Sequence, residues 1–317
     1  MRVAFLGCSQ FSTIVLDRLM QSHHQVVCVV SSIDKESGRG KHIELSEIKK
    51  YALSHNLPIL QYKRVSKEGE EDIKKFAPDV LVTASFGQML KENILNLAPY
   101  GVINVHASLL PKYRGSAPIN YCIINGEKET GITIMQTALA MDSGDIILQK
   151  SLPIDYLDNA SDLTLKLAHL GGECIVEGLD LLEKGQAKFV KQNEDEMTYF
   201  PKLNKEMSYI DFDKTAGQIH DFVRGVNPWP LARVNLNGEP LIVYSATPFN
   251  NFQNVNLDDY KHGEVVFASG KKGLIVRCYD GLVSLDIIQA PNGKKMEAKS
   301  YLNGKKIDVK TNLSKLV

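Results

Sequence analysis

The stretch GVINVHASLLPKYRGSAPI, residues 101–119, joins a run typical of a β-strand to a loop with two prolines, a glycine and two cations. Branched apolar residues at its start favour a buried, extended backbone. Asn104 and His106 lie two positions apart at the end of this strand, so their side chains project to the same face. Each proline then stiffens the loop by fixing one backbone angle. The stretch therefore predicts a strand that ends in a polar pair beside a rigid loop.

Similar strand patterns lie on both sides of this stretch and alternate with helical patterns. Apolar, β-branched runs occupy residues 2–7, 25–32, 57–62, 79–85, 130–138 and 144–154, and helical periodicity is clear at 11–22 and 161–185. Such alternation is typical of βαβ units. We therefore expect residues 1–185 to form one α/β domain around a mostly parallel, Rossmann-like sheet.

The last third of the chain has a different sequence pattern. Residues 186–205 are polar with weak periodicity, which favours a linker, and a helical pattern follows at 214–225. Short alternating runs then occur between NG, SG and DG turns, which predicts a small antiparallel, OB-like β-barrel over residues 206–317. Residues 261–317 contain eleven Lys and Arg against five Asp and Glu, a net charge of +6. This excess is either ordinary solvated surface or a face for a polyanion.

Composition excludes several classes of protein. The 37 basic and 37 acidic residues balance, so no global field indicates a nucleic-acid or membrane partner. No run reaches the 18 or so apolar residues of a membrane span, and no cleavable leader pattern opens the chain. The five cysteines are far apart, without the spacing of a zinc site or disulfide framework. We expect a soluble, cytoplasmic protein with reduced core cysteines and no metal.

The turn after the first strand does not predict dinucleotide binding. It has the sequence GCSQFS, which lacks the second and third glycines of the pyrophosphate-binding fingerprint. Gly7 is explained by an ordinary strand-to-helix turn.

The candidate chemistry lies at Asn104 and His106. A lone histidine at a strand end is more often structural, but the loop that follows adds Arg114 as a fixed cation and Gly115 for close approach of a ligand. Downstream, Asp142 and Asp145 flank a Ser-Gly turn, and a carboxylate near His106 would hold its tautomer and stabilise the imidazolium. From the residue pattern alone the two aspartates are equivalent candidates, and either could instead be a turn residue.

These residues together resemble the folate-dependent formyltransferases. That family carries Asn-X-His, then Ser-Leu-Leu-Pro-X-X-Arg-Gly, then an Asp-X-Gly turn, and this chain has Asn104, His106, SLLPKYRG at 108–115 and Asp142 of DSG. ETGITIMQ at 129–136, NPWPLA at 227–232 and GRGK at 38–41 resemble further signatures of the members that act on tRNA. Members that formylate glycinamide ribonucleotide resemble only the first domain. The prolines that usually surround GRGK are missing here.

The resemblance implies a formyltransferase fold and an activity. The formyl donor would be 10-formyltetrahydrofolate, and the acceptor would be the α-amino group of methionine on an initiator tRNA. The residues implied are Asn104, His106 and Asp142 for catalysis, Ser108, Leu109, Leu110, Pro111, Phe86, Gly87 and Leu90 for folate, and Arg39 and Lys41 for tRNA. Core packing explains Phe86 and Leu90 nearly as well. No long apolar edge or heptad run is evident, so we expect a monomer.

Other readings of the same residues lead to different substrates. Relatives that formylate an amino sugar nucleotide, or that hydrolyse formyl-tetrahydrofolate, share the Asn-X-His core and also have a second domain. A catalytically idle RNA-binding protein on the same scaffold is a third alternative. It would tolerate replacement of His106.

Overall fold

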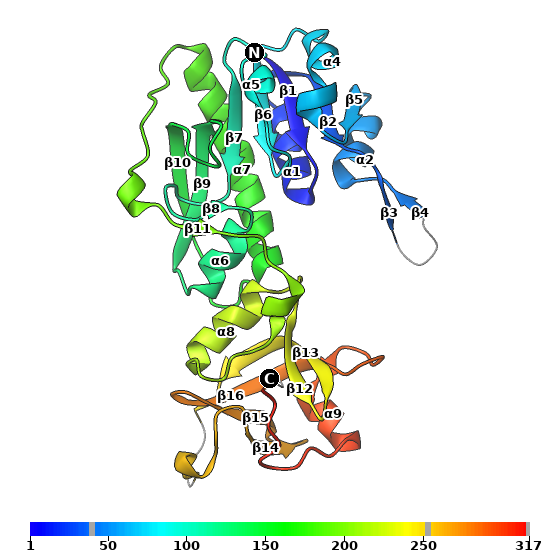
Figure 1. Cartoon of the computed structure of the whole chain (residues 1–317), viewed down its shortest axis with the longest axis vertical. Coiled ribbons are helices and arrows are strands. Elements are labelled where there is room, and N and C mark those ends of the chain that lie inside the picture. The colour runs from blue at the N-terminus through cyan, green and yellow to red at the C-terminus, as the bar shows by residue number, and fades with distance from the viewer. Residues whose placement is uncertain (38–41, 251–254, 315–317) are drawn as a thin grey trace. The chain divides into compact units, whose positions relative to one another are not determined.

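The computed structural model describes residues 1–37, 42–250 and 255–314, and the chain divides into two compact units (Figure 1). The first unit comprises Met1–Pro118, Glu129–Pro153 and Thr164–Pro201. The second comprises Ile119–Lys128, Ile154–Leu163 and Lys202–Val317. Two short segments of the expected first domain thus group with the second unit, and most of the expected linker at 186–205 groups with the first.

A seven-stranded sheet forms the centre of the first unit, in the order β10-β9-β7-β6-β1-β2-β5. Strands β5, β2, β1, β6 and β7 pair in parallel, while β9 and β10 pair antiparallel at one edge. The bounds are β1 (Arg2–Gly7), β2 (Gln25–Ser32), β5 (Ile59–Tyr62), β6 (Val80–Ala84), β7 (Val102–His106), β9 (Glu129–Gln136) and β10 (Ile146–Pro153). The expected mostly parallel, Rossmann-like sheet is confirmed.

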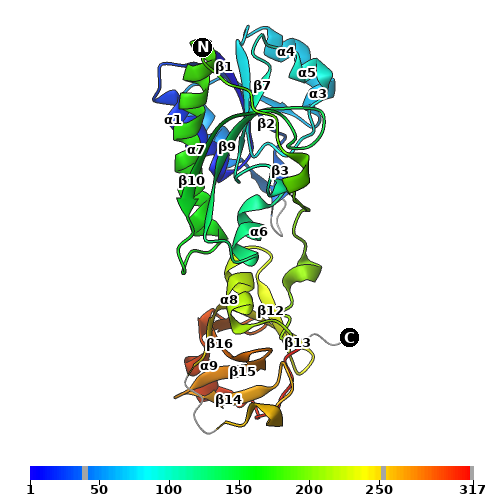
Figure 2. The same cartoon turned by 90° about the vertical axis from the view of Figure 1, so that its left-hand side faces the viewer.

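Helices cover both faces of this sheet (Figure 2). On one side lie α1 (Gln10–Met20) and α7 (Ala160–Glu183), and on the other lie α3 (Val65–Glu68), α4 (Glu70–Lys74) and α5 (Glu92–Leu95). Ser9 begins α1 with a capping box, in which its side chain and that of Ser12 satisfy each other's backbone N–H groups. Small residues let α7 approach closely, since a Cβ on Gly171 would lie 3.0 Å from Val105 of β7.

The strand order defines where a ligand can bind. From β1 the chain moves outward through β2 to β5, then returns to the opposite side of β1 as β6 and β7. In open α/β sheets such a reversal leaves a crevice beyond the carboxyl ends of the strands. The segments that follow β6 and β7, residues 85–90 and 107–115, therefore lie at the edge where a site is expected.

Several short elements of the first unit had no clear sequence signal. They are the β3 (Lys35–Ser37) and β4 (His42–Glu44) hairpin, α2 (Glu47–Ser54), β8 (Arg114–Gly115), the 3₁₀ turn η1 (Glu194–Glu196) and β11 (Tyr199–Phe200). Pairing of β11 with β8 is parallel, Tyr199 with Arg114 and Phe200 with Gly115. Two-residue strands have no periodicity to detect, so only the fold reveals them.

The second unit is built on an antiparallel sheet in the order β12-β13-β16-β15-β14, with β17 beside β16. Its strands are β12 (Ala232–Leu236), β13 (Glu239–Pro248), β14 (Val265–Ser269), β15 (Gly273–Cys278), β16 (Gly281–Gln289) and β17 (Met296–Glu297). The unit also contains α6 (Pro118–Ile124), α8 (Ala216–Gly225), α9 (Ala298–Gly304), η2 (Lys205–Ser208) and η3 (Leu257–Asp259). The predicted antiparallel strands are present, and β12 and β14 end a linear strand order, so closure into an OB-like barrel stays a prediction.

The main apolar core of the second unit lies between α8 and the sheet, and a smaller cluster surrounds Val266, Ile275 and Leu282. Ile219 and Val223 of α8 pack with strand residues such as Val243, Val276 and Leu285, all at most 1% exposed. Of the five cysteines, Cys28, Cys122, Cys174 and Cys278 are buried and Cys8 is half-buried, and all five are free thiols. The expectation of reduced core cysteines thus fits four positions fully. Among the described residues, no helix is long and apolar enough to span a membrane.

Candidate active site at the carboxyl ends of β6 and β7

Asn104 is positioned by the neighbouring strand. It pairs in register with Thr83 of β6, and the Thr83 hydroxyl donates a hydrogen bond of 2.9 Å to Asn104 Oδ1. With its oxygen held in this way, the amide directs its Nδ2 hydrogens elsewhere. No hydrogen-bond partner for Asn104 Nδ2 is present among the described residues. Asn104 is half-buried, so a neutral N–H donor is available at the strand end.

His106 is buried, with 6% of its surface exposed, and ends β7. Its Nε2 lies 3.0 Å from the backbone oxygen of Tyr113. A carbonyl oxygen only accepts, so Nε2 carries a hydrogen and the neutral ring has its lone pair on Nδ1. The tautomer is therefore set by the loop carbonyl, and not by an aspartate as expected from the residue pattern.

The two candidate aspartates differ in the structure. Asp142 places Oδ1 3.6 Å from His106 Nδ1, and its Oδ2 accepts a 2.8 Å hydrogen bond from the Gly115 N–H. Asp145 lies at the end of the same turn, where its backbone oxygen accepts from the Gln136 N–H, and no contact with His106 is found for it among the described residues. Geometry thus favours Asp142 as the acid that faces the imidazole, at a distance suited to an ion pair or a bridging water.

The backbone at Asp142 is strained. Its φ is +51°, in the left-handed region that few non-glycine residues adopt. The next turn residue, Gly144, allows no side chain at all, because an added Cβ would meet the Gln136 oxygen at 1.7 Å. Such strain persists only where surrounding contacts determine the conformation.

Those contacts come from residues 190–200, here called the strap. Val190 forms a β-bridge with Ile146, and β11 pairs with β8 at the strap's other end. Between them, Gln192 Nε2 donates to the backbone oxygens of Asp142 and Gly144, each at 2.8 Å. The expected linker therefore contributes to the candidate site itself.

Arg114 is also bound by side chains of the strap. Its guanidinium donates to both carboxylate oxygens of Glu194, at 3.0 and 2.7 Å, and to Gln192 Oε1 at 3.0 and 2.7 Å. These hydrogen bonds hold the pKa of Glu194 below its usual value. Arg114 is 5% exposed, so its charge serves the strap and not a free ligand site.

Residues 108–111 are held in place by several hydrogen bonds. The Ser108 hydroxyl donates to the Lys112 oxygen, and its backbone oxygen accepts from Thr133 Oγ1. The Leu110 N–H donates to Thr133 Oγ1, and the Leu110 backbone oxygen accepts from Gln149 Nε2. Ser108 and Leu110 are buried, while Leu109 and Pro111 are partly exposed. Any contact of this loop with a cosubstrate would therefore come mainly from apolar side chains and not from these bonded groups.

The second predicted folate segment follows β6, next to β7 in the sheet. Phe86 and Leu90 are 6% and 8% exposed and belong to the apolar core of the unit, as the alternative interpretation expected. Gly87 is exposed, has a φ of +72°, and has open space where a Cβ would be. Of these three, only Gly87 presents its backbone to solvent.

The remaining predicted residues, Arg39 and Lys41, lie outside the described residues. A separate cluster of His23, His24, Asp180 and Glu183 brings four possible metal-ligand atoms within 4.8 Å of one another. The terminal ammonium of Met1 already occupies this cluster, 2.9 Å from Glu183 Oε1 and 3.2 Å from His24 Nδ1. Its hydrogen bond, with that of His23, lowers the pKa of Glu183 to about 2. The cluster is explained as an ion pair of the amino terminus.

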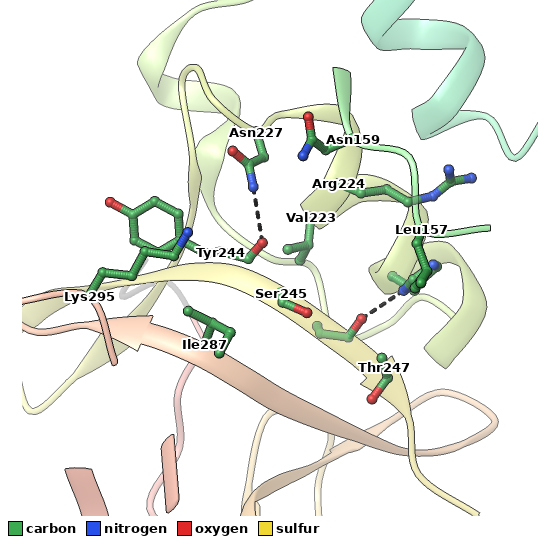
Figure 3. A pocket seen from close by; sticks show the side chains of 12 residues that line it. Leu157, Asn159, Val223, Arg224, Asn227, Tyr244, Ser245, Thr247, Ile287 and Lys295 are labelled. Atoms are coloured by element: carbon green, nitrogen blue, oxygen red, sulfur yellow. Dashed lines mark hydrogen bonds between the residues drawn. The ribbon is translucent and has the colours of Figure 1, made fainter. Parts of the chain in front are cut away.

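The second unit contains a cavity of about 240 Å³ beside α8 and β13 (Figure 3). Asn227 Nδ2 donates to the Tyr244 oxygen at 3.2 Å, and Lys295 Nζ lies 4.4 Å from the centre of the Tyr244 ring. His220 also lines the cavity, and both its ring nitrogens lie near carbonyl oxygens, 2.7 Å from that of Ala246 and 3.0 Å from that of Tyr156. Most of the polar groups that line the cavity thus form hydrogen bonds within the protein.

Comparison with known proteins defines the class. A formyl transferase family model matches residues 1–179, and the model of the formyl transferase C-terminal domain matches residues 202–306. The chain belongs to the formyl transferase family. It is 41% identical over 312 residues to the methionyl-tRNA formyltransferase of Streptococcus uberis, covering 98% of this chain and 97% of that protein. The enzyme of the same name from Acetivibrio thermocellus is 37% identical over 97% of both chains.

Solved structures agree on the fold. An N-formyltransferase from Helicobacter canadensis, in complex with folinic acid and dTDP-3-aminofucose, superposes with a TM-score of 0.66 over 93% of this chain and 99% of that one. At 20% identity, this likeness concerns the fold alone. The full-length match to the curated relatives is the more specific finding.

Sequence reasoning missed Thr83, Tyr113, Gln192 and Glu194. Thr83, Gln192 and Glu194 form hydrogen bonds with site residues that lie 21 to 80 positions away, and the Tyr113 oxygen contacts His106 from seven positions along the same loop. The polar run at 192–196 resembled a solvated connector. No local pattern distinguishes a glutamine that binds a remote backbone from one that faces water.

Proposed function

We propose that the chain transfers the formyl group of 10-formyltetrahydrofolate to the α-amino group of methionine on initiator methionyl-tRNA. The observation that carries this conclusion is the match, over nearly the whole of both chains, to methionyl-tRNA formyltransferases. Both domains are matched, whereas an activity confined to the first would leave the basic second unit without a role. The Asn104, His106 and Asp142 arrangement supplies the chemistry that such a transfer needs.

The reaction forms one C–N bond and breaks another. The methionine amine attacks the formyl carbon and gives a tetrahedral adduct with a negative oxygen, and Asn104 Nδ2 donates to that oxygen. The amine proton passes to His106 Nδ1, the nitrogen left with a lone pair by the Tyr113 contact. The bond to the folate nitrogen then breaks, and that nitrogen receives the proton. Formate never leaves as a free product.

Asp142 stabilises the charged imidazole during this transfer. Its Oδ1 lies 3.6 Å from His106 Nδ1. The Asp142 side chain is 16% exposed, so solvent screens this pair only in part. The folate would lie along the crevice beyond β6 and β7, against Leu109 and Pro111, with Gly87 as a point of close backbone approach. Ser108, Leu110, Phe86 and Leu90 would shape this crevice from beneath.

The tRNA would contact the basic second unit and the GRGK segment with Arg39 and Lys41. Antiparallel, OB-like barrels bind oligonucleotides, and lysine contacts with phosphate release counterions. Lys272 over Phe267 and Lys295 over Tyr244 place cations beside aromatic rings that could also contact bases. We expect binding to weaken steeply with salt. A monomer in the cytoplasm, where charged tRNA is made, fits this function.

The decisive experiment offers formyl-labelled 10-formyltetrahydrofolate with one of three acceptors. These are methionyl-initiator tRNA, methionyl-elongator tRNA and a dTDP-amino sugar. Label on the initiator tRNA, with little on the other two, supports the proposal. Label on the sugar alone would overturn it, and release of formate with every acceptor would identify a hydrolase.

A further inference from the structure

We propose that Gln192, in the strap, is a positioning residue that holds Asp142 in the conformation used for formyl transfer. This inference rests on the proposed function, and it adds a residue to the candidate site from a segment that resembled a linker. Asp142 has a φ of +51°, a strained backbone conformation that only contacts with other residues can maintain.

The amide of Gln192 fits its surroundings in one orientation only. Its Nε2 faces the backbone oxygens of Asp142 and Gly144, which can only accept, and its Oε1 faces the guanidinium of Arg114, which can only donate. Both ends of the side chain are therefore satisfied at once. Four hydrogen bonds of 2.7 to 3.0 Å fix one glutamine between two loops.

The contacts continue to the reacting groups. The carbonyls held by Gln192 belong to the turn that carries the Asp142 carboxylate, whose Oδ2 accepts from the Gly115 N–H and whose Oδ1 faces His106 Nδ1. Losing the Gln192 donors leaves the Asp142 side chain with its Gly115 contact, while the turn keeps only the Ser143–Ala140 and Gln136–Asp145 hydrogen bonds, neither of which involves Asp142, among those of the described residues. Asp142 would then relax away from the imidazole, because nothing else among the described hydrogen bonds pins its backbone oxygen.

Two substitutions separate the contacts of Gln192. Gln192→Glu keeps the length and the acceptor for Arg114 but replaces both N–H donors by oxygen. Glu194→Gln weakens the Arg114 pair and leaves the Gln192 donors in place. Gln186→Ala, an exposed position of the same polar segment, serves as the surface control. Thermal melting of each variant shows whether the strap remains folded.

The test is a double-mutant cycle on kcat with methionyl-initiator tRNA. We expect Gln192→Glu to lower kcat about tenfold in the wild-type background, with KM for folate and tRNA nearly unchanged, and to lower it less than about twofold when Asp142→Asn is already present. Gln186→Ala leaves kcat unchanged. An equal loss in both backgrounds means that Gln192 acts independently of Asp142 and overturns the proposal.

A second readout does not depend on the reaction. Ring NMR signals of His106, recorded at one pH, should move in Gln192→Glu and stay in place in Glu194→Gln, because only the former displaces the Asp142 carboxylate. Unmoved signals in Gln192→Glu contradict the inference. A wild-type chain that formylates no tRNA would refute the proposed function, while the NMR comparison still decides the role of Gln192.

Discussion

Two buried histidines, His106 in the first unit and His220 in the second, show what distinguishes a reactive side chain from a structural one. They are 6% and 5% exposed, so burial does not separate them. His220 has a carbonyl oxygen at each ring nitrogen and stacks on Tyr156, with ring centres 4.3 Å apart. His106 has a carbonyl at Nε2 only, and its Nδ1 faces a carboxylate at 3.6 Å.

The difference lies in what each ring can still bind. Every nitrogen of His220 is used by the fold, so removing it should cost stability and not chemistry. One nitrogen of His106 remains for a proton in transit, so removing it should cost chemistry first. The same contrast is expected for the acids beside the two rings, Asp142 near His106 and Asp286 near His220.

Replacing His106 gives the largest expected effect. His106→Ala should lower kcat by about 100- to 10,000-fold, the usual contribution of a positioned general base. Initial rates with initiator methionyl-tRNA, measured well below the melting temperature, test this expectation. A loss below tenfold would remove the contrast between the two histidines.

Replacing His220 should act on stability. His220→Leu removes the two ring nitrogens that face the Ala246 and Tyr156 oxygens, and a buried acceptor that loses its donor costs about 1–3 kcal/mol. Urea unfolding followed by fluorescence of Trp229, in the second unit, measures this loss. At temperatures where the variant is folded, we expect kcat within about twofold of wild type, since far less than the ~1.4 kcal/mol of a tenfold change should reach the transition state. A collapse of kcat in the folded variant would show that His220 is not merely structural.

The two aspartates of one turn refine the contrast. Asp142→Asn keeps the shape and the acceptor for Gly115 but loses the charge that faces His106, so kcat should fall about tenfold or more, equal to ~1.4 kcal/mol. Asp145→Asn should change kcat little, because no contact in the described part of the chain joins this residue to His106. Parallel rate measurements on the two variants decide the assignment, and equal tolerance of both would refute it.

Asp286 provides the smallest effect, a dependence of stability on pH. Burial raises the pKa of Asp286 above 3.8, against the opposing effect of hydrogen bonds from Ser284 and Thr247. The folded state therefore holds this proton more tightly than the unfolded chain, so its stabilising contribution is present below about pH 3.8 and is lost as pH rises through the raised pKa. Asp286→Asn should remove this loss. Unfolding free energies of both proteins between pH 3.5 and 7 should diverge in favour of the variant.

Much of the fold followed from periodicity. The seven strands of the sheet lie within two residues of their predicted ends, because long alternating or apolar runs report burial directly. The two-residue strands β8 and β11 were not predictable, since their pairing joins residues more than 80 positions apart. The strand order, which sets the position of the crevice, is likewise a property of the whole sheet.

The candidate site was predictable where chemistry depends on residue type and not where it depends on orientation. Asn104 and His106 could be placed on one face from their spacing, and the resemblance selected Asp142. Which nitrogen of His106 is free depends on the Tyr113 carbonyl, and the support of Asp142 depends on Gln192. Arg114 was predicted as a fixed cation, but its partner Glu194 is one that no sequence spacing indicates.

The close contact at Gly115 has a consequence for how the enzyme matures. The Phe200 oxygen lies only 2.2 Å from where a Cβ on Gly115 would be, and the same glycine donates its N–H to Asp142. A nascent chain that has emerged only as far as residue 185 already holds every side chain assigned to catalysis. It still lacks the segment that contacts Gly115 and supports the Asp142 turn, so the site is complete only once residue 200 has been added, 58 residues after Asp142.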